Sequence, residues 1–170
     1  MSNESRLRNR NSNGFTVVEV LLGISLLMIP AGLLAFEFPH YASMQQYASA
    51  TAREVSRTIA TTGQTATAQT VAEDVADNYG LNKTAVVVEP PNTAAPAPAN
   101  GQVIVSITLS DNGVPVGAVT RGGSVSVDVE MRTSVVSVNW LHDTLAATIT
   151  AHHVEVVDRY GSFQCDPGPC

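Results

Sequence analysis

The sequence is poor in basic residues. Nine lysines and arginines stand against fifteen aspartates and glutamates, which gives a formal net charge of −6 and an isoelectric point of about 5.0. A chain with this balance has no basic groove for the phosphate backbone of a nucleic acid. We therefore expect no nucleic-acid partner.

The sequence also lacks the motifs of metal, nucleotide and catalytic sites. It has no Cys-x-x-Cys pair, no His-Glu-x-x-His motif and no glycine-rich phosphate loop. Its four histidines are His40, His142, His152 and His153. They have no metal-ligand spacing, because the adjacent pair on a strand would point to opposite faces. We expect no metal and no cofactor.

Two groups of polar residues have side chains of the types found in catalytic sites. The first is Ser134, Ser137 and Asp143 near His142, but no nucleophile-elbow pattern surrounds these residues. The second is Asp128 and Glu130, whose spacing on one strand is typical of a solvated face rather than a general acid–base pair. We therefore expect a protein that is not an enzyme, with no catalytic residues.

Cysteine is scarce, since only Cys165 and Cys170 occur, with Asp-Pro-Gly-Pro between them. These intervening residues favour a turn that brings the two thiols together. Outside the cytoplasm the thiols would meet an oxidising compartment. We predict an intramolecular disulfide that fixes the tail locally, because so short a loop adds little stability. Intermolecular pairing is the main alternative.

One long segment is almost free of charge. The 22 residues 15–36 contain a single charged side chain, that of Glu19. As a helix they would extend roughly 33 Å, enough to cross a hydrocarbon core of about 30 Å. Three arginines precede the segment, and the next basic residue is Arg53, so we expect the N-terminus in the cytoplasm and the C-terminal domain outside. Small-x-small matches at 48–52 lie too far on for signal-peptidase cleavage.

Glu19 needs a reason to lie in such a segment. An acidic side chain within a membrane costs about 2.5–3.5 kcal/mol on insertion scales. If the chain were cut after Gly14, Phe15 would carry a free amine, and an ammonium about 4 Å from the carboxylate would return roughly 4 kcal/mol. The amine of a neighbouring subunit is the more natural partner. The alternative is that Glu19 reaches the headgroups by snorkelling.

The stretch Gly14-Phe15-Thr16-Val17-Val18-Glu19, after a short basic leader and before a long apolar helix, resembles the processing site of type IV prepilins and pseudopilins. The resemblance implies that a prepilin peptidase cuts after Gly14 and that the new terminal Phe15 is methylated. It also implies that Glu19 pairs with the amine of a neighbour during assembly. The expected partners are the membrane, the peptidase, other pilin or pseudopilin subunits and the assembly machinery.

An amphipathic helix follows the apolar segment. Apolar residues recur at steps of three and four, and polar residues fill the other side; the apolar set is Tyr41, Met44, Ala48, Ala52, Val55 and Ile59. Pro30 and Pro39 are expected to bend or interrupt this helix. The sequence of residues 14–62 resembles that of the TadE-like minor pseudopilins of tight-adherence (Tad, or Flp) pili.

Strands dominate the rest of the chain. After a short helix at 71–79 closed by Gly80, we expect strands at 84–89, 103–109, 125–131 and 145–157, with turns at 111–113 and 121–123. A change of phase near His152 and His153 predicts a bulge or a strand end there. Residues 90–101 form a proline-rich loop that we expect to be mobile and solvent-facing.

The expected fold class is therefore α+β: a long N-terminal transmembrane and amphipathic helix followed by a small antiparallel β-sheet outer domain. We expect a basic leader at 1–14 that is removed, a transmembrane helix at 15–37, an amphipathic extension at 38–62, a linker with a short helix at 63–83, a β domain at 84–160 and a cysteine-containing tail at 161–170.

The resemblance implies a minor pseudopilin-like component of a Tad-type pilus in the inner membrane, which acts in pilus biogenesis and surface adhesion and can enter a cell-surface pilus. The alternative is an uncleaved single-pass membrane protein whose outer β domain binds an envelope ligand or partner.

Overall fold

The computed structural model describes residues 4–134 and 146–159. Side chains are described at these positions except at 4–16, 30, 33, 34, 36, 37 and 134. The chain divides into two units, Met1–His40 and Tyr41–Cys170. Helix α1 (Glu4–Thr62) begins in the first unit and ends in the second. The fold is α+β, with helices and a mixed five-stranded sheet.

The first unit consists of the N-terminal part of α1. Pro30 and Pro39, which the sequence predicts to bend or interrupt the helix, lie inside α1 rather than at an end of it. A proline removes one backbone donor, and the turns on either side can still hold the helix. Across the described residues, no helix is both long enough and apolar enough for a membrane span. The segment expected to cross the membrane includes side chains outside the described set.

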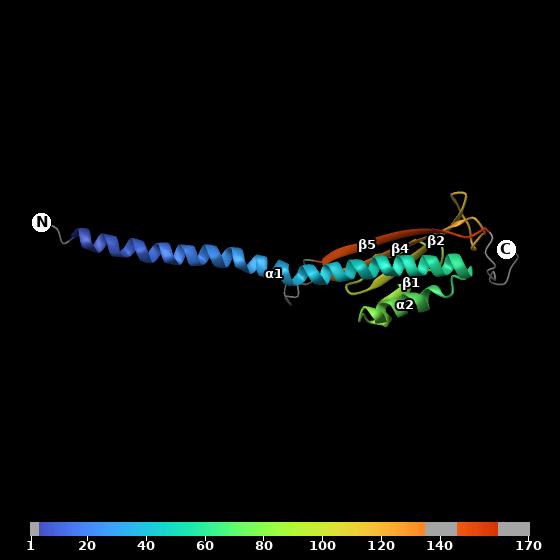
Figure 1. Cartoon of the computed structure of the whole chain (residues 1–170), viewed down its shortest axis with the longest axis horizontal. Coiled ribbons are helices and arrows are strands. Elements are labelled where there is room, and N and C mark those ends of the chain that lie inside the picture. Colours follow the sequence, from blue (N-terminus) through green and yellow to red (C-terminus); the bar gives the residue numbers. More distant parts are fainter. Residues whose placement is uncertain (1–3, 135–145, 160–170) are drawn as a thin grey trace. The chain divides into compact units, whose positions relative to one another are not determined.

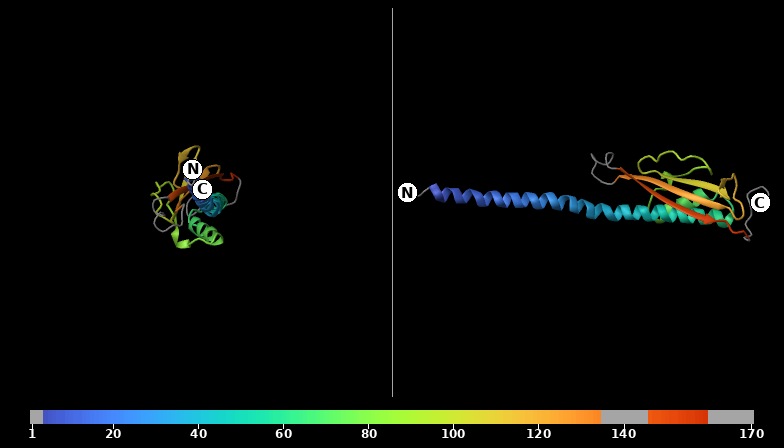
Figure 2. Two further views of the ribbon diagram at one scale, coloured as in Figure 1. Left: turned by 90° about the vertical axis from the view of Figure 1, so that its left-hand side faces the viewer. Right: turned by 90° about the horizontal axis from the view of Figure 1, so that it is seen from above.

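The second unit has two layers (Figure 1, Figure 2). The C-terminal part of α1 and the short helix α2 (Ala68–Asn78) lie against one face of the sheet. The buried core joins residues from both helices to alternate residues of the strands. The strand residues of this core include Val103, Val105, Ile107, Leu109, Val125, Val127, Val129 and Met131. The alternation predicted for these two strands is therefore confirmed.

The buried side of α1 is wider than the sequence indicates. Ala48, Ala52, Val55 and Ile59 are buried as expected, and Tyr41 and Met44 pack against the core. Tyr47 and two polar side chains, Thr51 and Ser56, are also buried in this stretch. The sheet and α2 both contribute side chains to the same core as α1. The buried arc of α1 is therefore broader than that of a helix that packs on a sheet alone.

Helix α2 ends as its sequence predicts. Gly80 has φ +69° just beyond the last turn. Leu81 N donates to Ala76 O over 2.8 Å, and Gly80 N donates to Asp77 O over 3.0 Å. These two bonds are those of a Schellman motif, in which a left-handed glycine lets the chain satisfy the last free carbonyls of the helix. The apolar side of α2 places Ala68, Ala72 and Ala76 in the core.

The sheet has the order β1-β2-β4-β5, with β3 paired to β2 beside this path. Its strands are β1 (Val86–Val88), β2 (Val103–Asp111), β3 (Val114–Pro115), β4 (Ser124–Ser134) and β5 (Ala146–Val156). A one-turn 3-10 helix η1 (Lys83–Ala85) precedes β1. The β2, β4 and β5 pairings are antiparallel, but β1 runs parallel to β2, with Val86 beside Val103. The expectation of a purely antiparallel sheet is therefore wrong.

The proline-rich loop explains this parallel pair. Parallel neighbours need a connection of a dozen or more residues, and the segment between β1 and β2 supplies it. Most of the loop is exposed, as expected, but Pro98 is buried. Asn92 ties the loop to the sheet: its backbone N donates to Ile107 O over 2.8 Å, and its Oδ1 accepts from Leu109 N over 3.0 Å.

Two tight turns follow the expected chemistry. Asn112 and Gly113 both have positive φ, +49° and +80°, as the two central residues of a type I′ hairpin between β2 and β3 require. Gly122 has φ +79°, and Gly123 N donates to Thr120 O over 3.1 Å, as in a type II turn.

The bulge expected near His152 and His153 is absent. β5 pairs with β4 in unbroken register from Val156 opposite Ser124 to Ala146 opposite Ser134. A bulge occurs instead at the turn, where Gly122 N donates to Val157 O and Val157 N donates to Gly123 O. Two residues thus face one, with a left-handed glycine first. The apparent phase change arises because half-buried His153 and Glu155 occupy the core side of the edge strand, while Val154 and Val156 are exposed on the other side.

Candidate functional site

The residues expected to govern processing and assembly all lie in the first unit. Gly14 and Phe15 belong to α1, and the Phe15 side chain is outside the described set. Glu19 is exposed on the same helix, one turn further on. Gly23 follows it at the next turn of that face, and a Cβ there would meet nothing within 4 Å. The Glu19 carboxylate is therefore accessible to a partner from outside the chain.

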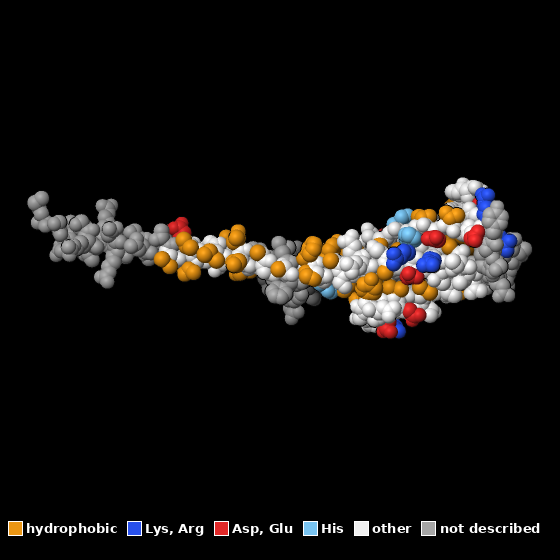
Figure 3. Space-filling model, in the orientation of Figure 1, with side chains coloured by type: hydrophobic (Ala, Val, Ile, Leu, Met, Phe, Trp, Pro, Cys, Tyr) orange, Lys and Arg blue, Asp and Glu red, His pale blue; other side chains and the backbone are white. Residues whose placement is uncertain are grey.

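Glu19 lies in a stretch of exposed apolar residues, and this part of α1 is largely orange in Figure 3. The large hydrophobic residues of 17–29 have exposed fractions between 52% for Ile24 and 79% for Leu26. Because they follow one another along the helix, they cover all of its sides rather than one stripe. A helix that is apolar all round is stable only where its surroundings are apolar, in lipid or against other helices. In residues 17–29, Glu19 is the single charged side chain.

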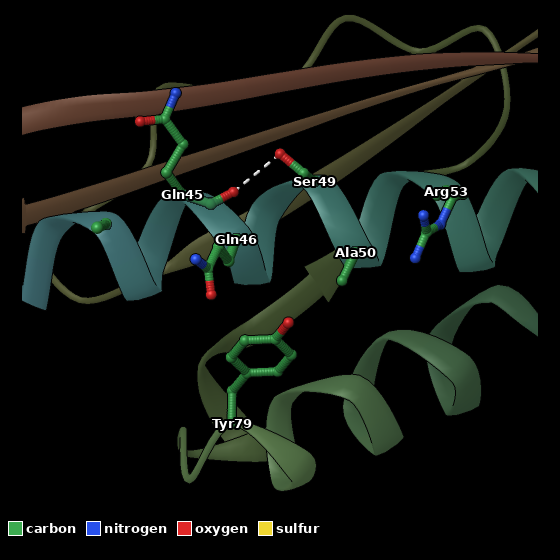
Figure 4. Close-up of a pocket in the computed structure, with 7 residues that line it drawn as sticks. Gln45, Gln46, Ser49, Ala50, Arg53 and Tyr79 are labelled. Carbon is green, nitrogen blue, oxygen red and sulfur yellow. Dashed lines mark hydrogen bonds between the residues drawn. The ribbon is translucent and has the colours of Figure 1, made fainter. Parts of the chain in front are cut away.

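A shallow groove of about 530 Å³ lies in the second unit, between α1 and the residue that follows α2 (Figure 4). Gln45, Gln46, Ser49, Ala50 and Arg53 line it from α1, and Tyr79 closes it from the other side. Ser49 Oγ donates to Gln45 O over 2.9 Å, so this hydroxyl is used within the helix. The remaining amides, guanidinium and aromatic ring can bind a ligand, but they include no pair of groups for acid–base chemistry.

Two hydroxyls of α1, those of Tyr47 and Thr51, are buried. Tyr47 and Thr51 are 0% exposed, and neither Tyr47 Oη nor Thr51 Oγ1 has a hydrogen-bond partner among the described residues. Burial raises the pKa of the Tyr47 hydroxyl above its ordinary value of 10.0, and the nearby Thr51 hydroxyl offsets part of that rise. The pattern of apolar residues along α1 did not predict that Tyr47 and Thr51 would be buried.

The outer face of the sheet brings together a Ser-His-Asp set that the sequence analysis did not single out. His152 Nδ1 lies 2.7 Å from Asp128 Oδ1 and 3.5 Å from Ser126 Oγ. A catalytic triad needs the serine on Nε2 and the carboxylate on Nδ1. Here both partners meet the same nitrogen on an exposed strand pair, so the set forms an ion pair or hydrogen bond rather than a nucleophile relay. The set forms because His152 lies opposite Asp128 in the pairing of β4 and β5. The sequence alone did not predict this register.

Several other residues named in the sequence analysis cannot be placed. His142, Ser137, Asp143, Cys165 and Cys170 lie outside the described residues. Ser134 ends β4, and its side chain is likewise not described. In the parts of the chain that are described, no three His, Cys, Asp or Glu side chains gather closely enough to hold a metal ion. The disulfide therefore stays a prediction.

Comparison of the chain with protein-family models, curated proteins and solved structures found no match. The function is therefore inferred from the residues of this chain and their placement.

Proposed function

We propose that the chain is a prepilin-like assembly protein, similar to the minor pseudopilins of Tad-type pili. In this proposal a prepilin peptidase cuts after Gly14, and residues 15–37 anchor the chain in the inner membrane before they pack into a fibre. The second unit lies outside and contacts other subunits. The protein would act in pilus biogenesis and surface adhesion.

The observation that carries the proposal is the helix around Glu19. Its apolar side chains are exposed on all sides, and together they need a lipid or helical environment. The one carboxylate, that of Glu19, lies five residues past Gly14. A cut after Gly14 in a neighbouring chain would create a free amine on Phe15 of that chain, and this amine is the proposed partner of the carboxylate. Attraction between the two charges, about 4 kcal/mol at an effective dielectric near 20, is similar in size to the cost of inserting the carboxylate.

Intact-mass measurement tests the proposal. Membranes from cells with prepilin peptidase should contain a chain that lacks residues 1–14 and carries one added methyl group on Phe15. Membranes from cells without the peptidase should contain the full-length chain. A Gly14→Val variant should remain uncut in both strains, because the peptidase is expected to need glycine immediately before the cut and valine adds a bulky side chain there. A full-length wild-type chain in both strains would contradict the proposal.

The groove next to Tyr79 supports a second candidate function, in which an uncleaved chain displays an outer domain that binds an envelope ligand. Amide, guanidinium and aromatic groups around a groove of this size provide both polar and stacking contacts. The same mass measurement separates the two functions, since only the first requires the loss of the leader.

A further inference from the structure

The two outer edges of the sheet, at β1 and β5, differ in whether other described residues bond to their outward backbone groups. At β1, the Gln69 side chain of α2 takes the place of a neighbouring strand: Nε2 donates to Val86 O over 3.1 Å, and Oε1 accepts from Val88 N over 3.1 Å. One amide thus supplies both a donor and an acceptor, as a strand residue would. The β1 edge is closed by this contact.

The β5 edge has the opposite character. Val157 N donates to Gly123 O, and bonds alternate along an antiparallel pair, so the odd-numbered residues of β5 bond to β4. The even-numbered residues direct their N–H and C=O groups away from β4; they are Ala146, Thr148, Thr150, His152, Val154 and Val156. Within residues 4–134 and 146–159, no loop or side chain forms a hydrogen bond to these groups.

β5 carries few of the devices that protect an edge strand, and the one it has is the inward-pointing charge of Glu155. Proteins usually block a long edge strand with lysine, proline, a bulge or a covering segment. β5 has eleven residues in unbroken register and contains no lysine, proline or glycine. Val154 and Val156 are 48% and 68% exposed on its outer face. An added strand would cover these two valines and pair the free backbone groups in one step.

The other face of β5 adds a charge preference. Glu155 lies on the core side near the end of the strand, and its side chain is 41% exposed. Its neighbour is His153, with Nε2 at 3.3 Å from Oε2. A basic side chain opposite Glu155 would therefore gain a cross-strand partner.

We propose that the open edge of β5 binds an extended segment of a partner protein as an added strand. Alternate β-branched side chains of that segment pack on Val154 and Val156, and a basic side chain on its other face pairs with Glu155. This inference does not depend on cleavage after Gly14 or on the role of Glu19.

Amide exchange of the full-length chain in detergent micelles, followed by NMR, tests whether the edge is free. In dilute protein, the amides of Thr150, His152 and Val154 should exchange fast, and those of Ile149, Ala151 and His153 should exchange slowly. If both sets are slow, another part of the same chain already covers the edge, and the proposal is overturned. Protection of the even-numbered set that appears only as protein concentration rises would assign the edge to a second copy and would also overturn it.

Peptide binding tests the stated chemistry. The probe is a fluorescein-labelled octapeptide that alternates valine and lysine, and its control has glutamate in place of lysine. We expect the lysine peptide to bind about tenfold more tightly, and Glu155→Lys to reverse that order. Thr150→Pro removes one outward N–H without breaking a bond to β4, and it should weaken binding about tenfold. Thr150→Ala keeps that N–H and should bind as the wild type does.

Three results contradict the proposal. They are no binding of either peptide, equal binding of both peptides to the wild type, and equal binding by Thr150→Pro and Thr150→Ala. Attraction of a basic peptide to an acidic protein would give the last result, because the proline variant keeps every charge. Circular dichroism of each variant confirms that the β5 pairing with β4 survives the substitution.

Discussion

The rings of Tyr47 and Tyr79 meet edge to face, with centroids 5.7 Å apart and planes at 62°. Tyr47 belongs to α1 and is fully buried, whereas Tyr79 follows α2 and is 40% exposed. Such edge-to-face pairs add about 0.5–1.5 kcal/mol to the burial of the rings. This contact joins the end of α2 to α1, and Tyr79 also lines the groove.

Tyr47→Phe should stabilise the protein, because it keeps the ring contact and removes a buried hydroxyl that has no hydrogen-bond partner among the described residues. The expected gain is about 1 kcal/mol in the free energy of unfolding at pH 7. Urea unfolding followed by circular dichroism measures it. The matched control is Tyr79→Phe at the exposed ring, which should change the free energy by less. A loss of stability in Tyr47→Phe would show that its hydroxyl has a partner.

The same residue gives a pH dependence. Since burial raises the pKa of Tyr47 in the folded state, the unfolded chain loses its proton first, at its ordinary pKa of 10.0. Below pH 10.0 the hydroxyl is neutral in both states, so its ionisation does not affect stability; as pH rises from there through the higher folded-state pKa, the free energy of unfolding falls. Wild-type protein should therefore lose stability more steeply than Tyr47→Phe above pH 10.0. Parallel unfolding curves for the two proteins across that range would contradict this expectation.

Gln69→Ala should open the β1 edge. The variant loses the bonds from Gln69 to Val86 O and Val88 N, so we expect a loss of about 1–2 kcal/mol in the free energy of unfolding. Amide exchange at Val88 should accelerate more than exchange in β4. Gln46→Ala, at an exposed position of α1, is the control and should leave both measurements nearly unchanged. Equal effects of the two substitutions would show that Gln69 does not close the edge.

Gly123→Ala should destabilise the turn before β4. A Cβ at this position would lie 2.5 Å from Thr120 Oγ1 and 2.7 Å from Ser110 O, and the second contact is with backbone that cannot move freely. The expected loss is about 1–3 kcal/mol. Gly117→Ala is the matched control, because a Cβ there meets nothing within 4 Å, and it should change stability by less than about 0.5 kcal/mol. Thermal unfolding of both variants tests the contrast.

Glu19→Ala should leave processing intact and impair assembly. The substitution removes the carboxylate that we propose to pair with a neighbour's amine, but it does not alter Gly14 or Phe15. Intact mass reports cleavage, and the amount of the protein in sheared surface fibres reports assembly. Ser25→Ala removes a polar group from the same helix without changing its charge and should assemble normally. Normal fibre incorporation of Glu19→Ala would refute the pairing.

The sequence predicts most local structure of the second unit because each signal is local. The alternation at 103–109 and 125–131 places those side chains in the core, and Gly80 ends α2 by adopting a left-handed conformation that other residues rarely adopt. Asn112 and Gly113 likewise form the turn that their types favour. These features depend on residues a few positions apart, so they can be predicted without knowing which distant segments become neighbours.

Pairing between distant segments is where the sequence was insufficient. The parallel β1–β2 pair, the bulge at Gly122 and Gly123, and the His152–Asp128 contact all depend on which strands become neighbours and in what register. A pattern with period two indicates a buried face but not the strand beside it. The burial of Tyr47 and Thr51 was missed for a related reason, since it requires both the sheet and α2 to join one core with α1.

The sequence by itself therefore determined the apolar segment with its single carboxylate, the amphipathic side of α1 and the location of the strands, because hydrophobic periodicity and charge are properties of the order of residues. Only the tertiary structure decided that Gln69 closes one edge of the sheet and that, among the residues the structure describes, nothing pairs with the outward backbone groups of β5 at the other edge. An edge exists only once strands have paired, so its donors and acceptors are defined by neighbours that lie far apart along the chain.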